Sequence, residues 1–216
     1  MALYEVLLFD LDGTLTDSKE GITKSVQYAL SKFGIEENEL KELEKFIGPP
    51  LDESFNKFYS LKDEKVDRAI KYYREYYSVK GIYENSLYLG VPELLTQLRK
   101  LDKNMYVATT KPTVFAKEVL KHFNLDSYFI KIVGSFLDGS RTSKKELIEH
   151  VLSHIPKVAK SKIVMIGDRM HDILGANQVG IDSIAVSYGY GSEVELMKAK
   201  PTYLVKSIKE LQNIFC

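Results

Sequence analysis

The sequence predicts an α/β fold, with a doubly wound, Rossmann-like parallel sheet as its core and an inserted α-helical subdomain. Two observations predict it. Short apolar runs alternate with helical patterns along most of the 216 residues, which is typical of a parallel sheet covered by helices on both faces. Between the first and second apolar runs, residues 18–81 show helical patterns and no strand pattern. We therefore expect these residues to form a separate helical unit.

The strands are predicted from runs of aliphatic and aromatic residues. The first run, residues 4–9, is almost continuously hydrophobic and ends in the turn Asp-Leu-Asp-Gly. A strand that is buried on both faces has this composition, whereas a half-exposed strand alternates apolar and polar residues. Further runs predict strands at 105–108, 130–133, 163–166, 183–186 and 203–205.

The helices are predicted from apolar residues at helical spacing. In the first inserted segment Ile22, Val26, Leu30 and Phe33 follow this spacing, and Gly34 is a stop signal. The same criteria predict helices at 37–46, 51–61 and 63–79 in the insertion, and at 92–101, 113–123, 143–154, 172–179 and 207–214 between the strands.

The domain boundaries follow from where strand patterns stop and resume. We expect a core domain made of residues 1–15 and 88–216, and a helical cap domain made of residues 16–87. The segments near Thr16 and near Leu89 are the expected hinges, because the chain leaves and re-enters the core there.

Composition restricts the classes of partner and compartment. Lys plus Arg equals Asp plus Glu at 30 each, so no overall field favours nucleic acid polymers or anionic membranes. No apolar run approaches the ~20 residues that a membrane span needs, and the N-terminal residues lack a signal-peptide pattern. The single cysteine, Cys216, agrees with a reducing compartment. We expect a cytoplasmic globular protein, a monomer by default with a dimer as the alternative.

Polar residues follow four of the predicted strands. Asp10 and Asp12 follow the first strand, Thr109 and Thr110 the second, and the later ends lead to the loop GSFLDGSRTSKKE and to the segment GDRMHD. The carboxyl ends of parallel strands share one edge of the sheet, so these side chains can converge. Three or more carboxylates without a Cys or His cluster predict a hard cation, Mg²⁺.

The order of these motifs resembles that of a known family. DLDGT, a strand-end Thr, a Lys and GDxxxD occur in this order in the haloacid dehalogenase superfamily, and the helical insertion after the first motif is similar to that of its phosphoglycolate phosphatase-like branch. The resemblance covers nearly the whole chain. It implies a Mg²⁺-dependent phosphatase that hydrolyses a small phosphate monoester through an aspartyl-phosphate.

The resemblance also implies a role for each motif residue. Asp10 is the expected nucleophile and Asp12 the general acid and base. Thr109, with Thr110, is expected to bind the phosphoryl oxygens, as is Lys144, which also balances negative charge; Lys145 is the alternative lysine. The expected metal ligands are Asp10, Asp12 through its backbone carbonyl, Asp168 and Asp172.

Substrate choice is expected to reside in the helical cap. FIGPPL, residues 46–51, matches the position of the family's specificity loop, which assigns substrate specificity to Gly48, Pro49 and Pro50. The expected partner is a small phosphorylated metabolite. Phosphoglycolate, a nucleoside monophosphate, a sugar phosphate and pyrophosphate all remain open as substrates.

Other interpretations remain open at this stage. A 5'-nucleotidase, a pyrophosphatase or a phosphosugar mutase of the β-phosphoglucomutase type has the same motifs. A non-catalytic phosphate-binding module is a further alternative, although binding alone needs no general acid. Asp168 and Asp172 also fit a helix N-terminus with an acid in its first turn. YGYGS at 188–192 lacks dinucleotide spacing, and we expect its glycines to form a flexible loop near the same edge.

Overall fold

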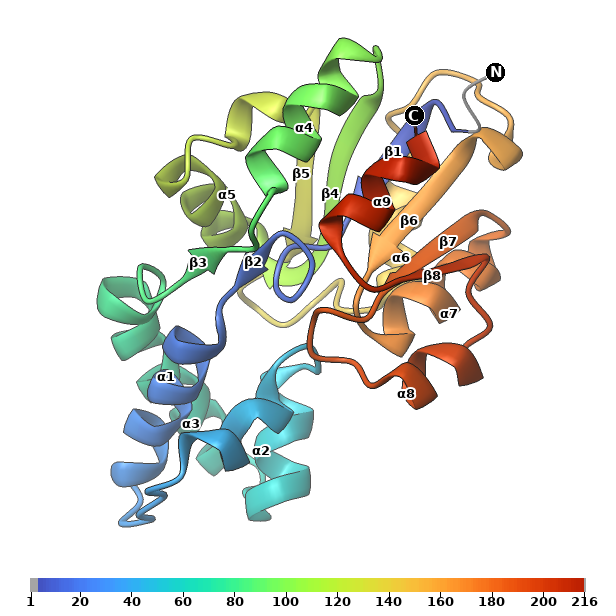
Figure 1. Ribbon diagram of the computed structural model, residues 1–216. Helices are drawn as coiled ribbons and strands as arrows, with labels where there is room; N and C mark the ends of the chain where they lie inside the picture. The colour runs from blue at the N-terminus through green and yellow to red at the C-terminus, as the bar shows by residue number, and fades with distance from the viewer. Residues whose placement is uncertain (1–3, 216) are drawn as a thin grey trace. The chain divides into compact units, whose positions relative to one another are not determined.

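Six parallel strands form the central sheet in the order β5-β4-β1-β6-β7-β8 (Figure 1). The structure, a computed structural model, describes residues 4–215, so the cysteine noted above, Cys216, lies outside it. Each of the six apolar runs overlaps one of these strands, which confirms the predicted α/β parallel-sheet core. The strands are β1 (Val6–Phe9), β4 (Asn104–Pro112), β5 (Lys131–Ser135), β6 (Ile163–Gly167), β7 (Asp182–Val186) and β8 (Tyr203–Val205).

The central strand β1 explains the continuous hydrophobicity of its sequence. All four of its residues have no exposed surface, because β4 and β6 flank it and helices cover both faces of the sheet. Phe9 is in register with Val107 of β4 and with Ile166 of β6. The residue after Phe9 therefore leaves the sheet at the same edge as the ends of both neighbouring strands.

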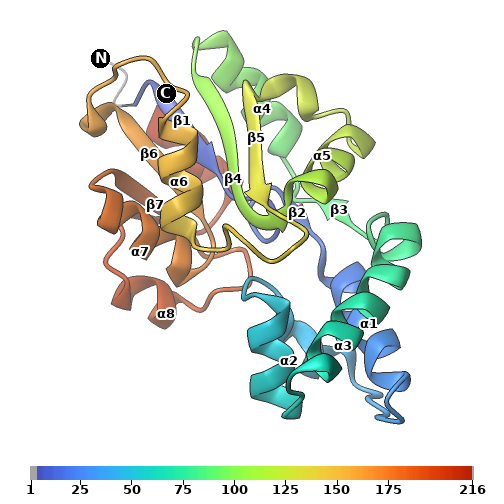
Figure 2. The ribbon, with the colours of Figure 1, turned by 180° about the vertical axis from the view of Figure 1, so that it is seen from behind.

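Helices cover the sheet in two layers. The helices α4 and α9 lie on the face toward the viewer in Figure 1, and α6 and α7 lie on the opposite face, as Figure 2 shows. Leu147 and Val151 of α6 pack into one apolar cluster with Val6 and Leu8 of β1. The helices of this unit are α4 (Val91–Lys100), α5 (Thr113–His122), α6 (Lys144–Leu152), α7 (Met170–Val179), α8 (Glu193–Lys198) and α9 (Ile208–Phe215), with 3₁₀ turns η3 (Asp126–Tyr128) and η4 (Lys160–Lys162).

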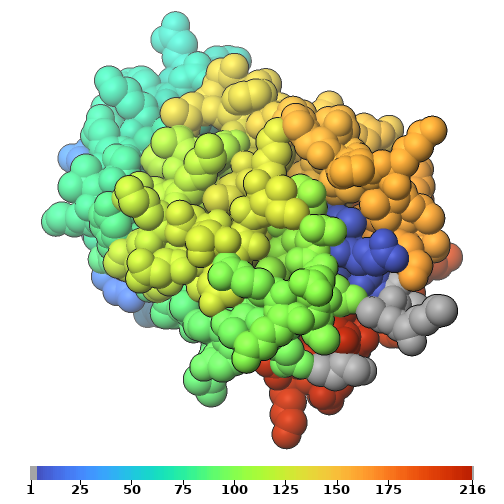
Figure 3. All heavy atoms as spheres, turned by 90° about the horizontal axis from the view of Figure 1, so that it is seen from above, coloured from blue at the N-terminus to red at the C-terminus, as the bar shows by residue number. Residues whose placement is uncertain are grey.

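At the edge of the sheet where the strands begin, main-chain hydrogen bonds join the neighbouring segments. Seen from this side, the first described residues (blue) lie between segments near residues 100 and 160, coloured green and orange (Figure 3). The Glu5 amide donates to the carbonyl of Lys162 at 2.9 Å, and the Asn104 amide donates to the carbonyl of Glu5 at 3.0 Å. The polar strand ends all lie at the other edge.

The chain divides into two compact units, and the second is the helical one, Asp17–Ser86. The chain passes between the units at β2 (Thr16–Asp17) and β3 (Ser86–Leu87), which pair with one another. A cluster of aromatic rings around Phe46, made with Phe55, Phe58 and Tyr59, packs this unit. Its helices are α1 (Lys19–Ser31), the 3₁₀ helix η1 (Leu40–Phe46), α2 (Leu51–Tyr59), α3 (Glu64–Tyr76) and the π-helical turn η2 (Tyr77–Gly81).

Three local predictions need correction. The helix expected at 37–46 is a 3₁₀ helix that begins only at Leu40, because the backbone at Glu39 is extended, with φ of −99° and ψ of 97°. The helix expected to end at residue 79 passes into η2 after Tyr76. The helix α8 was not predicted, because six residues are too few for a periodic pattern.

Within the described part of the chain, every helix is too short or too polar to cross a membrane.

Candidate active site

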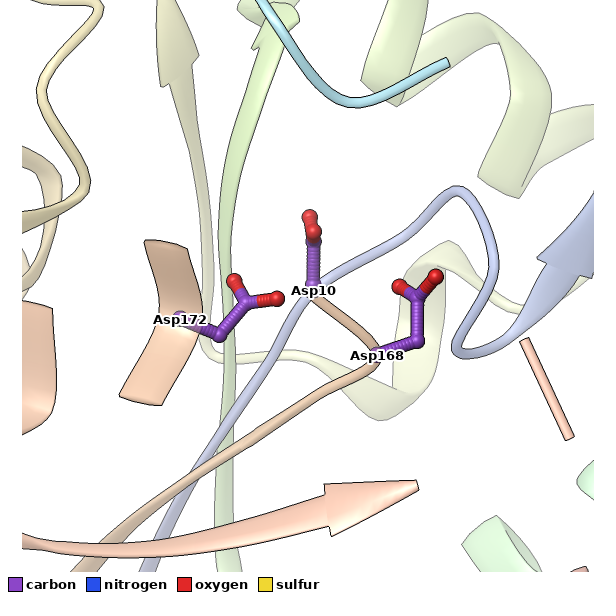
Figure 4. Close-up of side chains that lie close together, drawn as sticks. All are labelled: Asp10, Asp168 and Asp172. Carbon is purple, nitrogen blue, oxygen red and sulfur yellow. The ribbon is translucent and has the colours of Figure 1, made fainter. Parts of the chain in front are cut away.

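Three buried carboxylates meet where β1 and β6 end. Asp10 follows β1, Asp168 follows β6, and Asp172 lies in the first turn of α7. Figure 4 shows their carboxylates turned toward a shared space, and one oxygen from each lies within 4.8 Å of the others. Their relative exposures are 7%, 0% and 1%, so little water solvates them. The convergence of the first and fourth motifs is as expected from the parallel sheet.

Lys144 is the cation inside this cluster. Its Nζ lies 3.1 Å from Asp10 Oδ2 and 2.7 Å from Asp172 Oδ1, and it donates to the carbonyl of Ala108 in β4 at 2.9 Å. Lys145 points away, because its Nζ pairs at 3.8 Å with Glu149 on the exposed face of α6. The structure therefore places Lys144, not the alternative Lys145, against the carboxylates.

The protonation of the cluster depends on burial and on neighbouring charges. Burial raises the pKa of Asp10; Lys144 lowers it, Asp172 raises it, and hydrogen bonds from Thr109 and the Leu11 amide lower it, with a net increase. Burial also raises the pKa of Asp168 well above its ordinary range, and the charges of Asp172 and Asp10 add to the increase. Burial alone would lower the pKa of Lys144, but the carboxylates outweigh it and raise this pKa to about 12.

The donor set fits a divalent cation. Three carboxylates face one lysine, so the cluster carries excess negative charge that is buried and only partly compensated. The available ligands are all oxygens, as Mg²⁺ prefers. Asp10, Asp168 and Asp172 are the residues that would hold the ion, and among the residues that the structure describes they are the one acidic, His or Cys group close enough to do so.

Asp12 lies apart from this cluster and has its own lysine. Both of its carboxylate oxygens accept from Lys111 Nζ, at 2.8 and 2.5 Å. The Asp12 carboxylate is therefore held separately from Asp10, although the two residues are only two positions apart. Its expected contribution as a backbone ligand stays a prediction. No local sequence pattern pairs Asp12 with Lys111, and only the packing of β4 beside β1 reveals the pair.

The two threonines after Ala108 differ in their surroundings. The Thr109 side chain is buried next to Asp10, whose pKa it lowers, and its Oγ1 accepts from the Lys111 amide at 3.3 Å. The Thr110 carbonyl accepts from Ser135 Oγ at 2.7 Å, which fixes the backbone next to β5. Thr109 thus lies at the cluster as expected, and phosphate binding by either threonine stays a prediction.

Gly48, Pro49 and Pro50 lie in the helical unit, directly before α2. Gly48 adopts a positive φ of 104°, and Pro50 precedes the first residue of α2 with φ of −57°. A proline fits this position because its ring fixes φ near this value. Their assignment to substrate specificity stays a prediction.

The backbone at position 13 explains why a glycine follows Asp12 in the first motif. It adopts φ of +82°, and a Cβ at this position would lie 2.2 Å from Asp168 Oδ2. Any other residue would be strained and would displace the Asp168 carboxylate. The next residue, Thr14, donates from Oγ1 to Asp168 Oδ1 at 3.2 Å. Thr14 was overlooked in the sequence, although its place in DLDGT next to the acids was a signal.

Comparisons with known proteins find relatives that cover nearly the whole chain. A sequence model of the haloacid dehalogenase-like hydrolases matches residues 7–186. The chain is 48% identical over 211 residues to a 5'-nucleotidase of Pseudomonas aeruginosa, covering 98% of this chain and 95% of the relative. It is 38% identical to the tyrosine-protein kinase PtkA of Mycobacterium tuberculosis, covering 97% and 72%. A phosphoglycolate phosphatase of Vibrio parahaemolyticus is 24% identical, covering 97% and 95%.

A solved structure has the same fold over the whole chain. The crystal structure of a predicted phosphatase from Clostridium acetobutylicum superposes with a TM-score of 0.94 at 47% sequence identity, covering 98% of each chain. The match includes both the sheet unit and the helical unit, because it leaves almost no residue out. With the family match over residues 7–186, this chain belongs to the haloacid dehalogenase-like hydrolases, as a phosphatase of that family.

Proposed function

We propose that this phosphatase hydrolyses a small phosphate monoester in a Mg²⁺-dependent reaction, through an aspartyl-phosphate on Asp10. The observation that supports the proposal is that two nearby acidic side chains, Asp10 and Asp12, have different surroundings. Asp10 faces Asp168, Asp172 and Lys144 in the buried cluster, whereas Asp12 is held apart by Lys111. One acid can therefore attack while the other moves a proton.

The first half of the proposed reaction forms the phosphoenzyme. A carboxylate oxygen of Asp10 attacks phosphorus, and the bond from phosphorus to the leaving oxygen breaks while Asp12 gives that oxygen a proton. Lys144, 3.1 Å from Asp10 Oδ2, balances the negative charge that gathers between nucleophile and phosphoryl group. Mg²⁺, when bound, supplies further charge neutralisation to the phosphoryl oxygens.

The second half returns the enzyme to its starting state. Asp12, now ionised, takes a proton from a water molecule as the water oxygen attacks phosphorus. The bond between phosphorus and Asp10 breaks, and inorganic phosphate leaves. Asp12 then carries the proton needed for the next turnover, so protons balance over one cycle.

Changing Asp12 should affect substrates according to their leaving groups. Asp12→Ala is expected to lower kcat/KM for an alkyl phosphate by about 10²- to 10⁴-fold, the usual contribution of a general acid. The rate of the phosphorylation step with p-nitrophenyl phosphate should fall far less, because p-nitrophenolate leaves without a proton. Burst kinetics on both substrates would measure this, and equal losses would contradict the role of Asp12 as acid.

Changing Lys144 and Lys145 in turn should show which of the two lysines contributes to turnover. Lys144→Met is expected to lower kcat by about 10²- to 10³-fold, since it removes the cation beside the nucleophile. Lys145→Met is the matched control, because the exposed pair with Glu149 contributes little. Steady-state assays of both variants would test this. An equal loss in the control would show that the assignment of Lys144 is wrong.

The nucleoside 5'-monophosphates form the second candidate substrate class beside phosphoglycolate-like esters. The relative called a 5'-nucleotidase is 48% identical, against 24% for the phosphoglycolate phosphatase, and this difference favours nucleotides. A screen that compares kcat/KM for nucleotides, phosphoglycolate, sugar phosphates and pyrophosphate would decide between them. Conversion of one sugar phosphate into another would instead support a mutase, and no turnover with any metal would overturn the proposed metal-dependent reaction. Transfer of the phosphoryl group to a tyrosine would favour the activity named for the 38% identical relative.

We further propose that the helical unit acts as a cap, with Gly48, Pro49 and Pro50 contacting the leaving group. Two consecutive prolines give a stiff loop before α2, which suits a segment that must discriminate substrates. Replacing Pro49 and Pro50 by alanine is expected to change relative kcat/KM values across the same screen. Unchanged ratios would reject this assignment. We also propose that the protein is a monomer, with a dimer as the alternative, and that it is cytoplasmic, which agrees with its single cysteine.

A further inference from the structure

The loop at residues 188–192, with the sequence YGYGS, packs against Asp168. The Tyr190 amide donates to Asp168 Oδ2 at 2.8 Å. A Cβ on Gly189 would lie 2.4 Å from the Asp168 Cβ, and a Cβ on Gly191 would lie 2.0 Å from the Asp168 carbonyl oxygen. The two glycines therefore allow the loop backbone to approach Asp168 closely, at its side chain and at its main-chain carbonyl.

The other oxygen of Asp168 is held through Thr14. Thr14 Oγ1 donates to Asp168 Oδ1 at 3.2 Å, and the Thr14 carbonyl accepts from the Tyr188 hydroxyl at 3.0 Å. The Tyr188 ring packs edge-on against Tyr88, with ring centroids 5.0 Å apart. A connected path therefore runs from Tyr188 through Thr14 to Asp168, and it joins the 188–192 loop to the first motif.

The direction of each hydrogen bond in this path is fixed by chemistry. The Tyr188 hydroxyl carries a proton that it can donate. The Thr14 carbonyl can only accept. With donors on both Asp168 oxygens, the carboxylate cannot rotate freely, which is the requirement for a well-oriented ligand.

We propose that Tyr188 is a positioning residue of the metal centre: its hydroxyl holds Thr14, and Thr14 together with the Tyr190 amide holds the Asp168 carboxylate in the orientation that a divalent cation needs. The inference rests on the proposed Mg²⁺-dependent function. Tyr188 acts only through Thr14 and has no contact of its own with the Asp168 carboxylate oxygens among the hydrogen bonds of the described residues.

The test is Mg²⁺ binding by Tyr188→Phe, measured by titration calorimetry. The ring and its contact with Tyr88 stay, so the variant should fold, and thermal melting followed by circular dichroism checks this. Loss of the hydroxyl is expected to weaken Mg²⁺ binding about 10-fold, as for other residues that orient metal ligands. At saturating Mg²⁺, kcat should stay within about threefold of the wild-type value, because the bound ion restores the orientation of Asp168.

Tyr4→Phe is the matched control. The Tyr4 hydroxyl donates to Asp182 at 2.7 Å, and Tyr4 is buried before β1, at the edge of the sheet away from the cluster. This variant also loses one tyrosine hydrogen bond, so its melting temperature should fall by a similar amount, whereas its affinity for Mg²⁺ should equal that of the wild type. A purely structural role of Tyr188 would make the two variants alike.

A double-mutant cycle tests the route through Thr14. If Tyr188 acts through this residue, Tyr188→Phe combined with Thr14→Val should bind Mg²⁺ no more than about twofold more weakly than Thr14→Val alone. If the losses of Mg²⁺ affinity in the two single variants multiply in the double variant, the route through Thr14 is wrong. An unchanged affinity in Tyr188→Phe would overturn the inference while leaving the proposed function intact. Failure of the wild-type protein to bind Mg²⁺ would instead overturn the metal centre itself, and the inference with it.

Discussion

Replacing Asp10 with asparagine is expected to lower kcat by about four orders of magnitude or more, the usual loss when a covalent nucleophile is removed. Asparagine has nearly the same shape, so it can still accept from the Leu11 amide, which donates to Asp10 Oδ1 at 2.8 Å. Its amide oxygen is a poor nucleophile toward phosphorus. The loss therefore reports the missing carboxylate and not a missing fold.

The fold of this variant should be as stable as that of the wild type when metal is absent. Burial makes the ionised form of Asp10 unfavourable, which is why its pKa is raised, and a neutral amide avoids this cost. The melting temperature of Asp10→Asn in chelator is therefore expected to equal or exceed the wild-type value. A large decrease would show that Asp10 serves structure more than chemistry.

Rapid acid quenching with radiolabelled substrate would distinguish the covalent step from binding. The wild-type protein should retain label on Asp10, and Asp10→Asn should retain none. Asp182→Asn is the matched control, because this carboxylate accepts from Tyr4 at the start of β7 and lies outside the cluster. Mass spectrometry must first exclude deamidation of the new asparagine. More than about 1% of wild-type kcat in pure Asp10→Asn would rule out the covalent mechanism, since removing such a nucleophile costs far more than 10²-fold.

Removing Mg²⁺ is the second change with a large expected effect. A chelator should lower turnover by at least about 10³-fold, because the buried carboxylates then repel the phosphoryl group that Asp10 must attack. Activity should return on adding Mg²⁺ back. Undiminished turnover in chelator, with protein shown to be metal-free by elemental analysis, would overturn the proposed cofactor.

Metal binding should also stabilise the fold, by an amount that depends on pH. A ligand at 100 times its dissociation constant adds about 2.7 kcal/mol, or roughly 5–10 °C in melting temperature for a chain of this size. The pKa values of Asp10 and Asp168 are raised in the metal-free fold, so the folded state binds more protons than the unfolded state. Stability without metal therefore falls as pH rises from about 3.8 through the raised values.

The stabilisation by Mg²⁺ should grow over the same range of pH, because the ion replaces the protons that the cluster otherwise holds. Scanning calorimetry at pH 5.5 and pH 8, with and without Mg²⁺, would measure this, and the larger increase in melting temperature is expected at pH 8. Asp168→Asn should lose most of the increase, and Asp182→Asn should keep it. A pH-independent increase that survives in Asp168→Asn would place the ion elsewhere.

The sequence alone determined the alternation of strands and helices along the core and the edge of the sheet at which the chemistry lies. Buried parallel strands need continuous apolar runs, so VLLF in β1 and IVMIG in β6 are visible as strands. Because parallel strands end at one edge, Asp10 and Asp168 could be brought together without knowing any side-chain position. A sequence pattern can predict these features because each depends only on the residues of its own strand and on the parallel arrangement.

Only the tertiary structure decided which neighbouring side chains enter the cluster. Lys144 and Lys145 are adjacent and chemically alike, but successive residues of a helix point about 100° apart, so packing of α6 on the sheet buries one and exposes the other. In the same way, the pairing of Lys111 with Asp12 joins residues 99 positions apart. The path from Tyr188 through Thr14 to Asp168 consists of two hydrogen bonds between residues 174 and 154 positions apart. Such contacts depend on how strands and loops pack side by side, and no local pattern of residues contains that information.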